Sequence, residues 1–116
     1  MLMLCYVRCS TCAKARKWAD EHHLEYTLRD IKQNNPTRQE LGEWYRQSGL
    51  PLKKFFNTSG LIYKEKNLKN KLPTMTEEEQ LQFLATDGML VKRPLVVAKG
   101  KILLNFKDKE WEEALL

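Results

Sequence analysis

The sequence predicts one α/β domain with a mixed sheet, in which a β-α-β unit, a helical middle region and a β-β-α unit follow one another. Two observations predict this order. Residues 2–7 form an apolar run followed at once by helical spacing, and two apolar runs near the C-terminus flank a glycine turn. The chain has 116 residues, 42% of them hydrophobic, which suits one core. We therefore expect residues 1–116 to form a single domain.

The first part of the chain has the pattern of a strand, a helix and a second strand. Every position in 2–7 is apolar, which is typical of a strand covered on both faces. From Cys12 to His22 apolar side chains recur at helical spacing. Residues 24–28 alternate between apolar and polar side chains, which predicts a second strand. Together these elements predict parallel strands joined by a right-handed crossover.

The middle of the chain is predicted to be helical. Capping boxes at 37–40 and 76–79 begin two helices, the first of which ends at Gly49. Pro51 can open a short helix between them. Residues 61–72 are polar with scattered apolar positions, which favours a short helix and a loop.

The last part of the chain is predicted to be a hairpin and a helix. Residues 95–98 and 102–104 flank the turn 99–101, and Asp108 is expected to cap a final helix. The complete order is that of a thioredoxin-like fold with helices inserted between its two halves.

Composition and charge narrow the functional classes. The net charge of +5 mildly favours anionic partners. The lysines of residues 64–71 lack the interleaved aromatic side chains of a nucleic-acid platform, so we expect no direct nucleic-acid binding. No apolar run approaches the roughly 20 residues that span a bilayer, and residues 1–9 lack the features of a signal peptide. We expect no membrane partner and a cytoplasmic location.

The three cysteines lie within the first twelve residues, which indicates a local thiol site in a reducing compartment rather than a disulfide framework. Cys9 and Cys12 form a C-x-x-C motif between a buried strand and a helix, where free N–H groups of the helix stabilise a thiolate. Cys9 is predicted to be the nucleophile and Cys12 the resolving thiol. Ser10 and Thr11 add hydroxyl donors. Cys5 is expected to be a buried, inert core residue.

Two other interpretations of the cysteine pair stay open. Cys9 and Cys12 could be structural residues in a turn, although exposed thiols without a use are a liability. They could also bind zinc together with His22 and His23. The two histidines diverge by about 100° on a helix and miss the spacing of zinc fingers, so we expect no metal.

Three separate motifs resemble the arsenate reductase (ArsC)/Spx family, and the resemblance runs through essentially the whole chain in order. The first surrounds Cys9 and Cys12, the second covers 55–60 with Tyr63, and the third covers 89–97. The resemblance implies a thioredoxin-like fold with an inserted helical region.

The resemblance also assigns roles to individual residues. Arg93 would hold an anion or the thiolate, and Pro94 would be a cis proline beside the redox cysteine. Arsenate reductases of this family typically carry one active-loop cysteine and two further arginines, which should fall near Asn57 and Asn105. Here both positions are asparagine, which cannot form a charged bidentate clamp. We expect the anion site to comprise Ser10, Thr11, Asn57, Arg93, Pro94 and Asn105.

The leading hypothesis is a thiol–disulfide oxidoreductase of the arsenate-reductase-like branch, for which an oxyanion such as arsenate, or a disulfide, is the candidate substrate. No nucleotide fingerprint is visible, so we expect no bound cofactor and an external thiol reductant, either thioredoxin or glutathione with glutaredoxin. The alternative is an Spx-type redox-sensing regulator that binds RNA polymerase. A third hypothesis is a structural domain with incidental thiols.

Overall fold

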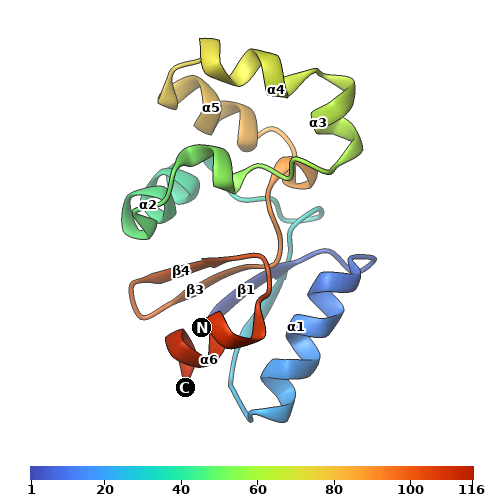
Figure 1. Cartoon of the computed structure of the whole chain (residues 1–116), viewed down its shortest axis with the longest axis vertical. Helices are drawn as coiled ribbons and strands as arrows, with labels where there is room; N and C mark the ends of the chain where they lie inside the picture. The colour runs from blue at the N-terminus through green and yellow to red at the C-terminus, as the bar shows by residue number, and fades with distance from the viewer.

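A computed structural model describes all residues, 1–116, and places a four-stranded mixed sheet between two sets of helices (Figure 1). The strands are β1 (Leu2–Cys5), β2 (Thr27–Asp30), β3 (Leu95–Ala98) and β4 (Lys101–Leu104). Their order in the sheet is β2-β1-β3-β4. β1 pairs in parallel with β2, whereas β3 is antiparallel to both β1 and β4. This arrangement confirms the mixed sheet and the thioredoxin-like fold.

The helices of the two halves lie on one side of the sheet and the inserted helices on the other (Figure 1). The first set comprises α1 (Ser10–Glu21) and α6 (Asp108–Leu115). The inserted set comprises α2 (Arg38–Ser48), α3 (Leu61–Glu65), α4 (Leu68–Lys71) and α5 (Glu77–Leu84), with the 3₁₀ turns η1 (Leu52–Phe55), η2 (Leu72–Thr74) and η3 (Gly88–Leu90). Both capping boxes form as predicted, and Gly49 ends α2 in the left-handed conformation at φ 66°.

Side-chain alternation along the strands divides the interior into two cores. In β1, Met3 and Cys5 face α1 and α6, while Leu2 and Leu4 face the inserted helices. The core on the α1 side is centred on the fully buried Trp111. The larger core on the other side is rich in aromatic residues from the insertion. The sheet therefore separates two chemically different interiors.

Four predicted boundaries differ in the structure. The first strand ends at Cys5, because a turn closed by the hydrogen bond from the Cys9 N–H to the Tyr6 carbonyl (3.0 Å) leads the chain away from the sheet. The second strand is Thr27–Asp30 rather than 24–28, since its pairing with β1 begins at Thr27.

Lys101 is the first residue of β4, so the hairpin turn has two residues, both with positive φ. Asp108 does not cap the last helix, whose N-cap is Lys107. The carboxylate of Asp108 instead accepts a hydrogen bond from Trp18 Nε1 at 2.8 Å.

Candidate functional site

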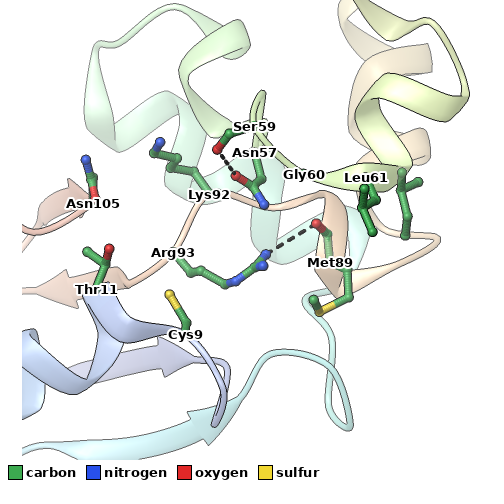
Figure 2. A pocket seen from close by; sticks show the side chains of 11 residues that line it. Cys9, Thr11, Asn57, Ser59, Gly60, Leu61, Met89, Lys92, Arg93 and Asn105 are labelled. Atoms are coloured by element: carbon green, nitrogen blue, oxygen red, sulfur yellow. Dashed lines mark hydrogen bonds between the residues drawn. The ribbon is translucent and has the colours of Figure 1, made fainter.

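A cavity of about 510 Å³ opens between the N-terminus of α1 and the inserted region (Figure 2). Four stretches of chain line it, namely the start of α1, residues 57–62, residues 89–93 and the residue that follows β4. The lining residues are Cys9, Thr11, Asn57, Ser59, Gly60, Leu61, Ile62, Met89, Lys92, Arg93 and Asn105. Five of the predicted site residues thus converge on one cavity.

Cys9 stands at the mouth of this cavity as the N-cap residue of α1. Its backbone is extended, with φ −83° and ψ 118°, and no side chain caps the first turn of the helix. The N–H groups of that turn are therefore available to a negative charge at the cap. The Cys9 sulfur is half-buried and points toward the side chain of Arg93 in Figure 2. This placement suits an attacking thiolate.

Cys12 lies one turn behind Cys9 and has no exposed surface. Its thiol hydrogen-bonds to Cys5, and this contact, together with burial, raises the pKa of Cys12. Cys5 accepts that hydrogen bond, so the pKa of Cys5 is lowered even though burial opposes the change. Cys12 also contacts Cys9. The prediction of a buried Cys5 is confirmed at 4% exposure, but Cys5 lies beside the Cys12 thiol rather than in purely apolar packing.

Arg93 is held above Cys9 by contacts on both sides of its guanidinium. The Arg93–Pro94 peptide bond is cis. Nη1 donates to the carbonyls of Met89 and Val91, both at 3.3 Å, and the guanidinium carbon lies 5.4 Å from the centre of the Tyr6 ring. Its buried Nε has no hydrogen-bond partner. Arg93 therefore brings a positive charge to the cavity wall while its Nε donor stays unpaired.

The two asparagines are fixed by backbone hydrogen bonds. The Asn57 N–H donates to the Leu90 carbonyl at 2.7 Å, which ties the inserted loop to the segment that precedes Arg93. Asn105 adopts a left-handed conformation at φ 68° and donates its N–H to the Pro94 carbonyl at 2.9 Å. Both residues reach the cavity as uncharged amides. Arg93 and Lys92 are its only cationic lining residues.

Two predicted anion-site residues do not line the cavity. Ser10 is exposed at the first position of α1, and Pro94 is buried. Sequence reasoning also missed lining residues, among them Lys92, Met89 and Leu61. They lie inside or beside the motif segments, yet no pattern distinguishes them from neighbours. Only Lys92 has a sequence signal: it adds a second positive charge directly before Arg93.

Two further observations concern other kinds of site. No group of three or more His, Cys, Asp or Glu side chains is arranged to hold a metal ion. His22 instead stacks on Trp18, with ring centroids 4.2 Å apart, and shares a hydrogen bond with the Trp18 carbonyl. None of the helices is long and apolar enough to cross a membrane.

The chain matches the ArsC family over residues 4–114. It is 51% identical over 108 residues to the uncharacterized protein YusI of Bacillus subtilis, covering 93% of this chain and 92% of YusI. It is 27% identical over 105 residues to the regulatory protein MgsR of the same organism, covering 90% and 82% of the two chains.

Solved structures agree with this relationship. An ArsC-family-related protein from Bacteroides fragilis superimposes with a TM-score of 0.93 and 60% identity, over 97% of this chain and 94% of that one. A protein described as a possible arsenate reductase from Streptococcus mutans gives 0.86 and 43%, over 91% and 90%. The family resemblance is confirmed, and the chain belongs to the ArsC family, with its thiol oxidoreductase fold.

Proposed function

We propose that the protein is a cytoplasmic thiol–disulfide oxidoreductase in which Cys9 is the nucleophile and Cys12 resolves the mixed disulfide. The observation that carries the proposal is that the two thiols differ in their accessibility from the cavity. Cys9 opens into the cavity at an uncapped helix N-terminus, whereas Cys12 is buried one turn behind it and in contact with it. Substrate can therefore reach the first thiol but not the second.

The two thiols supply both electrons of the reaction. The Cys9 thiolate attacks one sulfur of a substrate disulfide, and the other sulfur leaves as a thiolate. Cys12 then loses its proton and attacks the Cys9 sulfur, which releases the second substrate thiolate and leaves a Cys9–Cys12 disulfide. An external thiol reductant, thioredoxin or glutathione with glutaredoxin, returns the pair to the dithiol. With arsenate as substrate, arsenic(V) would accept the same two electrons and leave as arsenite, and one arsenate oxygen would leave as water with the two thiol protons.

The cavity favours disulfide substrates over arsenate. Arg93 and Lys92 supply positive charge, but Asn57 and Asn105 offer only neutral donors, and Leu61, Ile62 and Met89 add apolar wall. A small, highly charged oxyanion gains most from charged bidentate contacts. An organic disulfide with one anionic group uses one guanidinium and an apolar surface. We therefore place disulfides first and retain arsenate as the second candidate.

The test follows NADPH oxidation coupled separately to thioredoxin and to glutathione with glutaredoxin. An organic disulfide and arsenate are supplied in parallel to the wild type, Cys9→Ser and Cys12→Ser. We expect turnover with the disulfide that Cys9→Ser abolishes, and a stable mixed disulfide on Cys9 in Cys12→Ser. Turnover with arsenate alone would reverse the order of substrates. Equal turnover in the wild type and Cys9→Ser would overturn the proposal.

A regulatory role is the second candidate, and the similarity to MgsR favours it. In that case the Cys9–Cys12 disulfide would alter the start of α1 and thereby the affinity for RNA polymerase. Purified polymerase is immobilised and exposed to reduced protein, oxidised protein and Cys12→Ser. Binding that changes with oxidation only in the wild type would support a regulator. Absence of binding in every state would remove this candidate.

A further inference from the structure

The third cysteine is placed for chemistry that the proposed function does not use. The alternation of side chains along β1 directs Cys5 to the face covered by α1, where it packs in one core with Cys12. Cys9 packs against the same core, and the neighbouring Cys5 thiol raises the pKa of Cys12. The three cysteines thus form a chain from the cavity to the interior, with Cys9 at the cavity and both Cys5 and Cys12 buried.

Arg16 provides an independent observation at the inner end of this chain. It follows Cys12 by four residues on α1, so both side chains lie on the same face of the helix. Its Nε is buried and has no hydrogen-bond partner. An unpartnered buried donor is costly, and a negative charge beside it would offset the cost. The charge of Arg16 acts on Cys5, where it lowers the pKa of the thiol.

We propose that Cys5 is a third redox thiol, which takes the disulfide over from Cys9 and stores it inside the protein. The inference rests on the proposed function, because the Cys9–Cys12 disulfide is its starting point. Cys5 attacks the Cys12 sulfur, the Cys9–Cys12 bond breaks and a Cys5–Cys12 bond forms. Cys9 leaves as a thiolate, stabilised at the uncapped N-terminus of α1.

The exchange balances without any other reactant. One S–S bond replaces another, so no electrons are gained or lost overall. The proton that Cys5 gives up is matched by the proton that Cys9 takes when its thiolate becomes a thiol. The exchange changes exposure, because Cys5 and Cys12 are 4% and 0% exposed while Cys9 faces the cavity. The oxidised protein then carries a hidden disulfide and a free Cys9.

Trypsin distinguishes the two disulfides, because the chain has Arg8 between Cys5 and Cys9 and Lys14 after Cys12. Purified full-length protein is oxidised with diamide, its free thiols are blocked with N-ethylmaleimide, and the digest is analysed by mass spectrometry. A Cys9–Cys12 bond stays within peptide 9–14. A Cys5–Cys12 bond links peptides 1–8 and 9–14, with the maleimide on Cys9. We expect the linked species in the wild type.

Variants make the result decisive. Cys9→Ser retains only Cys5 and Cys12, and we expect it to lose two hydrogens on oxidation as a monomer. Arg16→Gln should lower the linked fraction of the wild type several-fold. Cys5→Ala, with Cys5→Val as a second variant should the first fail to fold, should retain the bond within 9–14 and lose the link.

The outcomes separate this inference from the proposed function. An oxidised wild type that holds only the bond within 9–14, together with Cys9→Ser that keeps two free thiols, would overturn the role of Cys5 and leave the Cys9–Cys12 pair intact. A wild type that forms no intramolecular disulfide would overturn both.

Discussion

The two faces of the sheet differ in what they contribute. The face covered by α1 and α6 carries all three cysteines and a small core in which Ala15 and Ala19 let α1 approach the strands closely. The face covered by the insertion carries a larger aromatic core and no thiol. Its helices α2 and α5 are joined at the surface by the ion pair of Arg38 with Glu78. All the thiols thus lie on one face of the sheet.

The cavity forms where these two regions meet. The backbone of the Phe55–Asn57 segment is hydrogen-bonded to residues 90–92, and this pairing holds the inserted loop beside the Arg93 segment. Cys9 comes from one face, while Asn57, Leu61 and Arg93 come from the other region or the connection to it. We infer that substitutions on the α1 face change reactivity, whereas those in the insertion change stability or substrate preference.

The largest expected effect is the loss of the nucleophile. Cys9→Ser should lower disulfide reductase turnover at least about 10³-fold, because a hydroxyl cannot replace the thiolate. Its urea midpoint should remain close to that of the wild type, since Cys9 is only half-buried. Steady-state kinetics and urea unfolding measure the two quantities. A large decrease in the urea midpoint would show that the Cys9 side chain also stabilises the fold.

The next effect concerns the close contact between Gly88 in η3 and the backbone that follows β2. A Cβ at position 88 would lie 1.7 Å from the carbonyl oxygen of Ile31, which follows β2. Gly88→Ala should therefore lower the free energy of unfolding by about 3 kcal/mol. Urea unfolding measures this change. The matched control is Gly42→Ala, where the nearest atom is the end of the flexible Arg38 side chain. The control should change stability by less than about 1 kcal/mol.

A smaller effect is expected for the charge above Cys9. Arg93→Ala should slow the reaction of Cys9 with an anionic aromatic disulfide about 10-fold at pH 7, and slow a neutral dipyridyl disulfide less. The guanidinium attracts the anionic reagent as well as the thiolate. Stopped-flow absorbance measures both rates. Lys92→Ala removes the same charge from the same cavity as a control, and an equal effect would mean that only net charge matters.

The smallest effect lies at the edge of the insertion. Arg29 donates from Nη1 and Nη2 to the two carboxylate oxygens of Glu40, at 2.7 and 3.0 Å, and lowers the pKa of Glu40 to about 2. Stability from this pair is complete above the ordinary pKa of 4.5 and is lost as the pH falls from there toward 2.

Glu40→Gln should lower the free energy of unfolding at pH 7 by only about 1 kcal/mol, because its side chain is 35% exposed and solvent screens the pair. Urea unfolding at pH 7 and pH 3 should show the difference from the wild type shrinking at the lower pH. If the wild type and Glu40→Gln differed equally in unfolding free energy at both pH values, the ionised Glu40 carboxylate would not be the source of the stabilisation.

The sequence predicted the order of elements because local signals and buried strands agree along this chain. The capping boxes, Gly49 and the Lys99–Gly100 turn are local features, so they were readable directly. The convergence of Asn57 and Asn105 on Cys9 came from the family resemblance, since these positions are far apart in the chain. The position of Lys92 in the cavity wall and the packing of Cys5 with Cys12 depend on tertiary structure, so no sequence periodicity could predict them.

The alternation of β1 has a consequence for comparing relatives. Positions 1, 3 and 5 face α1, while 2, 4 and 6 face the insertion. A cysteine at position 3 or 5 of this strand lies on the same side of the sheet as Cys12, whereas the sheet separates a cysteine at 2 or 4 from it. In a relative with this fold, the odd or even position of a cysteine in this strand thus decides whether it shares a core with the C-x-x-C motif.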